Sequence, residues 1–444
     1  MGNKILLAAL LSATALTAAT PAFAQETADV AAELAAMRAK IDSLEAEVAA
    51  HKAADPAPAP AKASTTKVTW KGAPEFEGEG GWSFKPRGRL QYDVGHVGSP
   101  DGVADRGLGF SNELRRARLG VTGTIPGGFD YKFELDFAEG DAEITDATIG
   151  YDAGGGFGLT IGQHNGFQSL EELTSSLSTS FIERAAFTDA FNFERRVGLS
   201  AGYENGPFIA NAGIFTDNIH DLDDENNSLG ADGRIVLAPK MGKTQLHFGG
   251  SAHYRDNRDL AERGDTVRYR QRPLIHSTDT RFLATPGLGV TEETSYGLEA
   301  AAIHGPFHAA GEVHWLNADL ADPAASSPTF FGGYAEVGYF LTGETRGYKG
   351  GKFDRTKVLN PVGDGGFGAF QVNLRYDHLD LNDAGILGGR QQGYQASLVW
   401  IPQDHVRFLL NYGRMSYDDA AIPALARDRD YSIDVIGARA QVDF

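Results

Sequence analysis

The chain ends in the segment Ser432-Ile-Asp-Val-Ile-Gly-Ala-Arg-Ala-Gln-Val-Asp-Phe444, in which apolar and polar residues alternate. Its apolar face holds Phe444, Val442, Ala440, Ala438 and Ile436, and its polar face holds Asp443, Gln441 and Arg439. This period predicts a β-strand with one face toward lipid and the other toward water. Strands of this kind cross a bilayer only as closed barrels, because closure satisfies every backbone polar group without water.

Sixteen such segments follow one another between residues 82 and 444, and one of them alternates Phe370, Val372 and Leu374 with polar residues. They are approximately 82–94, 115–123, 129–137, 144–151, 157–163, 195–203, 207–216, 232–238, 244–255, 294–303, 306–316, 333–341, 366–376, 392–400, 405–414 and 432–444. We therefore predict an all-β fold, a sixteen-stranded antiparallel transmembrane β-barrel. A barrel of this size leaves room for an aqueous channel.

The connections support this prediction because short and long ones mostly alternate. Short links such as 125–128 and 204–206 are separated by longer ones, among them 164–194, 256–293 and 377–391. Transmembrane barrels have short periplasmic turns and long outer loops. Two links depart from the pattern, since 138–143 is a short outer link and 342–365 is a long turn. A soluble β-sandwich or propeller is the alternative, but it leaves the loop pattern and the terminal aromatic Phe444 unexplained.

The first 81 residues predict three segments before the barrel domain (82–444). Residues 1–24 have a lysine near the start, an apolar core and an Ala-x-Ala site, which indicates a secretory signal peptide rather than a membrane anchor. Residues 25–52 are expected to form a periplasmic coiled-coil helix, and residues 53–81 a linker rich in proline and alanine.

The coiled-coil prediction rests on an apolar stripe with a 4-3-4-3-4 spacing. The stripe consists of Val30, Leu34, Met37, Ile41, Leu44 and Val48. A heptad pattern with charged residues between the apolar positions is typical of self-association. A single frayed helix is the alternative, because an isolated helix of this length is marginally stable in water.

Composition narrows the function classes. The chain has no cysteine, so it has neither disulfides nor thiolate metal sites, and its net charge of −19 argues against nucleic acid as a partner. The sequence shows no H-E-x-x-H, G-x-S-x-G or phosphate-loop motif. We therefore predict neither an enzyme nor a cofactor or metal site, and we interpret His247, His253, His308 and His314 as polar residues of the pore wall.

The strand alternation directs several arginines into the lumen. On the first strand it points Arg87 and Arg89 inward, and on the second it points Arg116 and Arg118 inward. Guanidinium groups stay charged and bind phosphate or carboxylate oxygens in a fork geometry, so an arginine row favours anions. The alternative is that these arginines pair with luminal carboxylates, among them Glu134, Asp136, Glu312 and Glu336, and only hold the wall together.

Two long loops are candidates for narrowing the pore. The segment 164–194 carries Ser175, Ser176 and Arg184, and the segment 256–293 carries Arg268, Arg270 and Arg272. These last three arginines share one face if their segment is extended, which would give an anion a series of weak sites. The alternative is an outer loop that binds lipopolysaccharide phosphates.

Several motifs, in this order, resemble the phosphate-selective porins of the O and P type over most of 82–444. They are Gly88-Arg-Leu-Gln91, Leu114-Arg-Arg-Ala-Arg-Leu-Gly120, Ser169-Leu-Glu-Glu-Leu-Thr-Ser-Ser176, Arg268-Tyr-Arg-Gln-Arg-Pro273 and Gly338-Tyr-Phe-Leu-Thr-Gly-Glu-Thr-Arg346 with Gly351-Lys-Phe-Asp354. The resemblance implies a homotrimer of sixteen-stranded barrels that pass small anions by diffusion along arginines.

The resemblance also implies individual roles. It places Arg89, Arg115, Arg116, Arg184, Arg268, Arg270 and Arg272 at luminal arginine positions and Ser175 and Ser176 at constriction hydroxyls. The strand alternation instead points Arg115 outward, and the two expectations conflict at this residue. A second departure is Glu172, which stands where the phosphate-selective members have a lysine; a carboxylate there would raise the barrier to an anion.

We therefore expect an outer-membrane porin that gives passive, anion-preferring diffusion of phosphate or polyphosphate, with outer-membrane lipid and lipopolysaccharide around it. A general diffusion pore is the second hypothesis. A structural tether that joins the outer membrane to the cell wall through the N-terminal helix is the third.

Overall fold

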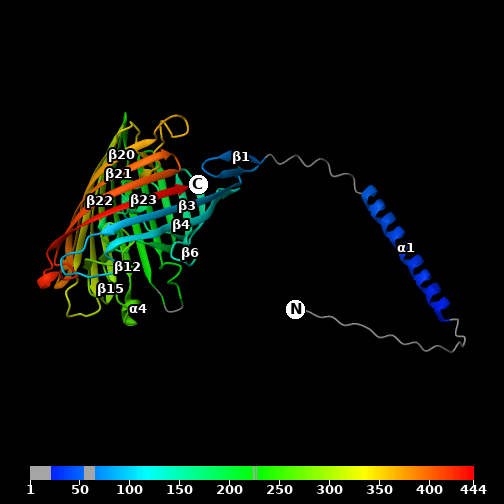
Figure 1. The fold of residues 1–444 in the computed structure, drawn as a ribbon, viewed down its shortest axis with the longest axis horizontal. Helices are drawn as coiled ribbons and strands as arrows, with labels where there is room; N and C mark the ends of the chain where they lie inside the picture. Colours follow the sequence, from blue (N-terminus) through cyan, green and yellow to red (C-terminus); the bar gives the residue numbers. More distant parts are fainter. Residues whose placement is uncertain (1–21, 55–65, 224–225, 227) are drawn as a thin grey trace, which may run out of the picture. The chain divides into compact units, whose positions relative to one another are not determined.

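The computed structural model describes residues 22–54, 66–223, 226 and 228–444, and they form two separate units. The N-terminal unit contains helix α1 (Ala22–Ala54), which spans the predicted coiled-coil segment (Figure 1). Leu34, Met37, Ile41, Leu44 and Val48 are each about half exposed on it. Pairing of α1 with other copies stays a prediction. Most of the predicted signal peptide (1–24) lies outside the described residues.

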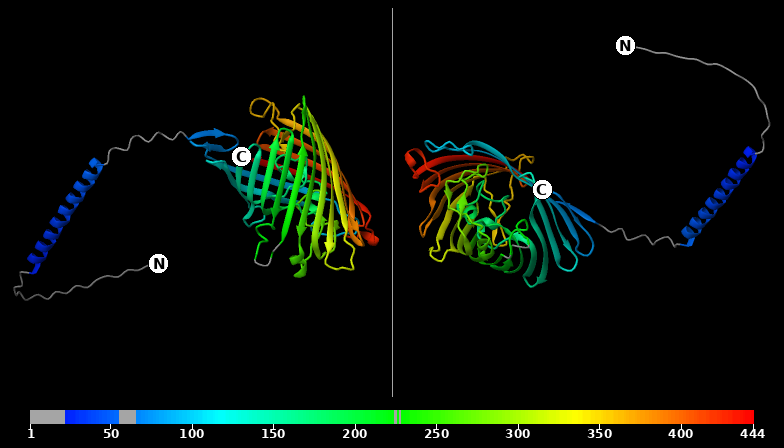
Figure 2. Two further views of the ribbon diagram at one scale, coloured as in Figure 1. Left: turned by 180° about the vertical axis from the view of Figure 1, so that it is seen from behind. Right: turned by 90° about the horizontal axis from the view of Figure 1, so that it is seen from below.

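The second unit is the predicted sixteen-stranded antiparallel barrel (Figures 1 and 2). Its strands are β3 (Ser83–Val97), β4 (Gly109–Ile125), β5 (Phe129–Asp136), β6 (Glu143–Gly154), β7 (Phe157–Asn165), β8 (Arg195–Asn205), β9 (Phe208–Phe215), β10 (Leu229–Leu237), β12 (Thr244–Asp256), β15 (Val290–His304), β16 (Phe307–Leu320), β17 (Thr329–Phe340), β20 (Ala369–Asp383), β21 (Ile386–Gln403), β22 (Val406–Asp418) and β23 (Tyr431–Asp443). Each strand pairs with the next along the chain, and β23 closes the ring on β3.

The closing seam is completed by the last residue. The Phe444 amide donates to the Gly88 carbonyl at 3.0 Å, and the Gly88 amide donates back to the Phe444 carbonyl at 3.1 Å. The Phe444 ring lies over Gly88 so closely that a Cβ atom at this glycine would lie 2.0 Å from the ring. The terminal aromatic ring therefore packs directly on this glycine, and a larger residue at position 88 would force the ring to move.

The outer wall is apolar, as the alternation predicts, and aromatic rings gather where the short connections lie. Phe370, Trp400 and Phe408 follow one another across β20, β21 and β22, with ring centroids 5.9 Å and 5.3 Å apart. Phe129 and Tyr151 form a similar pair at 4.9 Å on β5 and β6. Aromatic girdles of this kind mark the boundary of the bilayer in transmembrane barrels. No helix among the described residues is long and apolar enough to span a membrane.

We call the end of the barrel where β3 terminates the loop end and the opposite end the turn end, and we number the connections L1–L8 and T1–T7 from β3. Three connections contain further elements. Loop L3 (166–194) contains α2 (Leu170–Leu173) and α3 (Ala186–Ala190); loop L5 (257–289) contains α4 (Arg258–Glu262), β13 (Arg270–Gln271) and β14 (Leu283–Ala284); turn T6 (341–368) contains β18 (Gly347–Lys349) and β19 (Lys352–Asp354). Short elements β11 (Lys240–Met241) and η1 (Leu425–Arg427) lie in T4 and L8.

The structure differs from the sequence-based boundaries in two places. The predicted linker 53–81 contains a hairpin of β1 (Lys67–Trp70) and β2 (Pro74–Glu77), and β2 pairs with β3, so the barrel unit begins near residue 66 rather than at 82. The prediction of a long loop at residues 377–391 is wrong. Strands β20 and β21 continue to a two-residue turn, Ala384–Gly385, in which both residues have positive φ, as a tight β-hairpin requires.

Candidate pore lining and constriction

Loop L3 lies inside the barrel, against the inner wall formed by β16, β17 and β20 (Figure 2). The Leu170 and Glu171 amides, at the start of α2, each donate to the Glu312 carboxylate at 2.8 Å. The Ala186 amide, at the start of α3, donates to the Asp377 carboxylate at 3.0 Å. Because the first amides of a helical turn have no partner within it, these wall carboxylates fix both ends of the loop.

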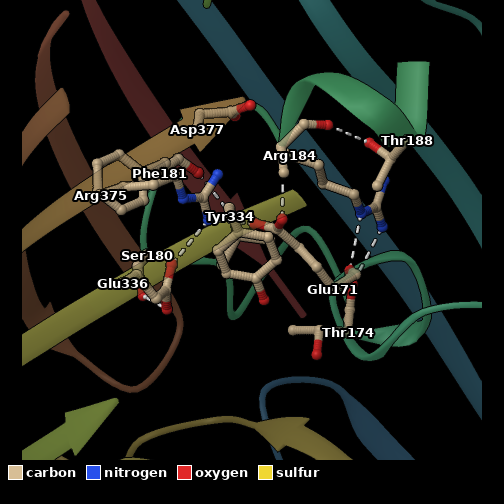
Figure 3. A network of polar contacts seen from close by, with 12 residues as sticks. Glu171, Thr174, Ser180, Phe181, Arg184, Thr188, Tyr334, Glu336, Arg375 and Asp377 are labelled. Atoms are coloured by element: carbon tan, nitrogen blue, oxygen red, sulfur yellow. Dashed lines mark hydrogen bonds and ion pairs between the residues drawn. The ribbon is translucent and has the colours of Figure 1, made fainter. Parts of the chain in front are cut away.

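The strongest anchor of L3 is Arg375, which β20 carries into the lumen (Figure 3). Its guanidinium forms ion pairs with Glu171 of L3 and, at 2.7 Å, with Glu336 of β17. The rings of Phe181 and Tyr334 lie on its faces, with centroids 4.3 Å and 4.7 Å from the guanidinium carbon. Burial raises the pKa of Glu171 to about 7, against the opposing charge of Arg375.

The opposite side of L3 is tied to the seam of the barrel. Glu183 accepts a hydrogen bond from Arg115 at 2.9 Å and another from Arg439 at 2.8 Å. Although burial opposes ionisation, these arginines hold the pKa of Glu183 well below its usual range. The Ser176 hydroxyl accepts from Arg89 at 2.9 Å, whereas Ser175 is exposed. The structure thus brings the predicted constriction hydroxyl Ser176 to the predicted luminal arginine Arg89.

The Arg184 side chain forms hydrogen bonds within L3 and does not extend freely into the pore (Figure 3). It donates to the carbonyls of Glu171, Glu172 and Thr174 at 2.9–3.0 Å. Its guanidinium also pairs with the Glu172 carboxylate at 3.4 Å. Glu172 is buried, which raises its pKa. In the structure the Glu172 carboxylate is thus paired with Arg184 and largely covered, and its effect on the barrier to an anion stays a prediction.

Arg115 shows why strand alternation failed at one position. A β-bulge opposite Gln91 and Tyr92 places Arg115 and Arg116 side by side on β4, and both reach the interior. A bulge adds one residue to one strand and changes the face of the side chains beyond it. The outward prediction for Arg115 is wrong, and the inward placement implied by the family resemblance agrees with its contact to Glu183.

The predicted luminal arginines divide into paired and unpaired groups. Arg118 contacts both Glu134 and Asp136, so here the predicted alternative of wall-stabilising pairs holds. Among the described residues, Arg116 donates to the Gln91 side chain at 2.9 Å. Within the described part of the barrel, Arg87, Arg89 and Arg116 form no ion pair with a carboxylate.

Loop L5 presents its three predicted arginines on one edge, as its alternation predicts. Tyr269 and Gln271 are buried between them, while Arg268 and Arg270 are exposed and form no ion pair with any described residue. Arg272 differs because its amide donates to Asp189 of L3 at 2.8 Å and its side chain contacts the Thr278 carbonyl and Asp279. Arg272 therefore joins L5 to L3.

A cavity of about 440 Å³ lies between L3, L5 and the wall of β4 to β6. Side chains of both charges line it. They include Arg115, Arg118, Arg184, Arg195 and Arg272, and Asp136, Glu139, Glu143, Glu172, Glu183, Asp189, Glu194 and Asp377. Most of these carboxylates bond to an arginine or to a backbone amide, whereas Glu139 and Glu143 form no ion pair with a described residue.

Turn T6 supplies site residues that sequence reasoning missed. Arg346 contacts Glu336 at 2.9 Å, and Tyr348 and Gly351 contact His247 of β12 and Arg234 of β10. The unusual length of this turn was the available signal. The ion pair of Lys132 with Asp146 was not predicted either, although the alternation of segment 129–137 places Lys132 on its polar face.

A closed sixteen-stranded barrel with an apolar outer wall, a charged lumen and a loop folded inside it is the architecture of an outer-membrane porin. The chain matches the phosphate-selective porin O and P family over residues 84–444, and it belongs to that family. It is 46% identical to an uncharacterized protein of Caulobacter vibrioides, with 99% of this chain and 96% of that protein covered. It is 26% identical to Porin O of Pseudomonas aeruginosa, with 76% and 84% covered.

Solved structures confirm the fold. An anion-selective porin from Comamonas acidovorans matches 82% of this chain and 100% of that chain with a TM-score of 0.52 at 14% identity. In vitro folded OmpT of Vibrio cholerae matches 82% of this chain and 98% of that chain with a TM-score of 0.52 at 11% identity.

Proposed function

We propose that this porin gives passive, anion-preferring diffusion across the outer membrane. The observation that supports the proposal is that several luminal arginines have no carboxylate partner in the described part of the chain, whereas most luminal carboxylates have a cationic partner. Arg87, Arg89 and Arg116 on the wall, and Arg268 and Arg270 on L5, have no carboxylate partner among the described residues. A guanidinium without a counterion attracts a passing anion, whereas a neutralised one does so weakly.

The luminal carboxylates are, in contrast, largely compensated. Around L3, Glu171 pairs with Arg375, Glu172 with Arg184, and Glu183 with Arg115 and Arg439. On the wall opposite, Glu134 and Asp136 pair with Arg118, and Asp146 pairs with Lys132. These carboxylates thus each have a cationic partner, whereas the five arginines named above have no carboxylate partner within the described barrel, although the whole chain carries a net charge of −19.

Phosphate is the first candidate solute. The family description names phosphate, and the relative Porin O belongs to the same type of porin by name. Arginine suits phosphate because its planar fork matches two phosphate oxygens at once. In this reading Arg268 and Arg270 meet the anion first, and Arg116, Arg89 and Arg87 receive it in turn along β4 and β3.

A general diffusion pore remains the second candidate, because one observation favours it. Glu139 and Glu143 line the cavity with no cationic partner among the described residues. Two carboxylates without a cationic partner on this cavity attract cations and weaken selection by charge.

Replacing Arg268 and Arg270 together with alanine tests the proposal. We expect the anion-to-cation permeability ratio to fall, measured as the reversal potential in a salt gradient across a planar bilayer. A unit charge about 7 Å from an ion in water contributes about 0.6 kcal/mol, so each arginine changes the local anion concentration roughly threefold at low salt. Block of chloride current by phosphate should weaken in parallel.

The matched control removes two outer charges elsewhere, by replacing Arg106 and Arg427 with alanine; both are exposed, on L1 and L8, and neither forms an ion pair with a described residue. Arg272 is left intact because its contacts hold L5 to L3. If the control lowers the ratio as much as the test variant, Arg268 and Arg270 act only as surface charge. If neither variant changes the ratio or the phosphate block, the general diffusion pore replaces the anion-preferring one.

We further propose that the protein is a homotrimer, with its turn end and helix α1 in the periplasm and its loop end facing lipopolysaccharide. The half-exposed stripe on α1 supports self-association, because three stripes would bury one another. Attachment of α1 to the cell wall is the alternative use of this helix.

Replacing Leu34 and Ile41 with aspartate should abolish self-association of a peptide of residues 25–55, measured by analytical ultracentrifugation. Charged residues at coiled-coil core positions leave buried charges without partners. A pair of exposed charge changes at Glu33 and Lys40 serves as the control. Association that persists in the aspartate variant would exclude the coiled coil, while insertion of the full-length barrel should be unchanged in both variants.

A further inference from the structure

Glu336 holds two connections that come from opposite ends of the barrel. Its carboxylate, on β17, accepts from the Ser180 hydroxyl of L3 at 3.1 Å and from Arg346 of T6 at 2.9 Å. It also accepts from Arg375 at 2.7 Å, and Arg375 in turn binds Glu171 of L3. Figure 3 shows Glu336 beside Ser180 and Arg375, with the chain of L3 around them.

Arg346 also connects T6 to L3 directly. One of its terminal nitrogens binds Glu336, and the other donates to the Ser178 carbonyl of L3 at 3.3 Å. The Phe353 ring of T6 lies against this guanidinium, with its centroid 3.6 Å from the central carbon. Arg346 is almost fully covered, so water does not compete for these bonds.

We propose that Glu336 and Arg346 are positioning residues that join L3 to T6 inside the lumen, so that breaking the contact between Arg346 and Glu336 loosens L3. The width of the constriction then depends on a contact made from the turn end. This inference concerns the geometry of the pore, and it stands whether or not the pore prefers anions.

Loss of the Arg346 side chain should loosen the contact without unfolding either connection. T6 remains attached through the Arg234 bond to the Gly351 carbonyl at 2.8 Å and the His247 bond to the Tyr348 hydroxyl at 2.6 Å. L3 remains attached through Glu312, Asp377 and Arg375. The expected change is therefore confined to the L3 stretch from residue 176 to 180.

Because the chain has no cysteine, one cysteine introduced on L3 is the single thiol that a maleimide can label. Ser176→Cys places one thiol at a buried position that contacts Arg89 and not Glu336. In the full-length protein in vesicles, we expect Arg346→Ala to raise the rate at which a neutral maleimide reacts with this thiol several-fold. Open-channel current noise should rise in the same variant.

The matched control is Arg355→Ala. Arg355 is also an arginine of T6, but it binds Asp443 of β23 and the Asp404 carbonyl, not L3. Its loss should leave the thiol rate near that of the parent. In addition, Glu336→Gln and Arg346→Ala combined should change the rate no more than the larger single effect, because both substitutions break the same link.

Three results would overturn the proposal. The first is an Arg346→Ala rate equal to the parent rate, and the second is an equal rise in Arg355→Ala, which would mean that any damage to T6 loosens L3. The third is a thiol reaction rate in the double variant that rises by the product of the two single-variant increases, which would mean that the two substitutions act independently. If Glu336→Gln does not yield a heat-modifiable barrel, the comparison of Arg346→Ala with Arg355→Ala decides the matter alone.

Discussion

Replacing Arg375 with methionine is expected to loosen L3 around Glu171, while Glu312 and Asp377 still bind the two ends of the loop. The substitution leaves Glu171 without its cation and Glu336 with only Arg346, in a place where both carboxylates are buried. Breaking a buried ion pair by removing one partner typically costs about 3–5 kcal/mol. Single-channel conductance should increase and fluctuate, and the anion-to-cation ratio should fall, because the carboxylates under L3 become exposed to the lumen.

Two further variants make this experiment decisive. Arg414→Met removes an arginine from an exposed pair with Asp434, and it should change neither conductance nor selectivity, because exposed pairs contribute about 0–1 kcal/mol. Combining Arg375→Met with Glu171→Gln removes both partners and should restore much of the parent conductance. A parent-like channel in Arg375→Met alone would show that Arg375 does not hold L3, provided that heat modifiability confirms a folded barrel.

The barrel could be predicted from the sequence because its signal is local. Each strand alternates over about ten residues, and the sixteen predicted segments correspond to the sixteen strands of the ring. Prediction failed where the alternation continued beyond the expected end of a strand, and where a bulge interrupted it. The alternation of β20 and β21 continues to Ala384–Gly385, and a bulge on β4 reverses the direction of Arg115.

The constriction could be predicted only in part, because its contacts join distant residues. Alternation placed Arg89 and Arg116 inward, and the loop containing Ser176 was a candidate for the lumen. No local pattern shows that Glu171 meets Arg375, more than two hundred positions later, or that Arg346 reaches L3 from the opposite end. Glu172 illustrates the difference, since its charge is visible in the sequence but its neutralisation by Arg184 depends on how L3 folds back on itself.

Deleting Phe444 is expected to reduce sharply the amount of folded, heat-modifiable barrel in the outer membrane. The deletion removes two reciprocal hydrogen bonds with Gly88 at the seam of β23 and β3. Together these bonds contribute about 1–3 kcal/mol in water, and unsatisfied backbone groups cost more in lipid. Among the described strands, the seam of β23 and β3 is the pairing that joins the two ends of the barrel sequence. Neighbouring strands therefore cannot replace the hydrogen bonds of its last residue pair.

Two substitutions separate the backbone from the ring at this position. Phe444→Ala keeps both hydrogen bonds and loses the aromatic cover over Gly88, whereas Phe444→Tyr keeps the bonds and nearly all of the ring. If the two backbone hydrogen bonds with Gly88 contribute most to assembly, the alanine variant should assemble better than the deletion. If the ring matters most, alanine and deletion should be equally poor, and tyrosine should assemble normally. Normal assembly of the deletion itself would mean that the barrel closes without its terminal residue, because the remaining pairs from Asp443 to Val435 already hold β23 against β3.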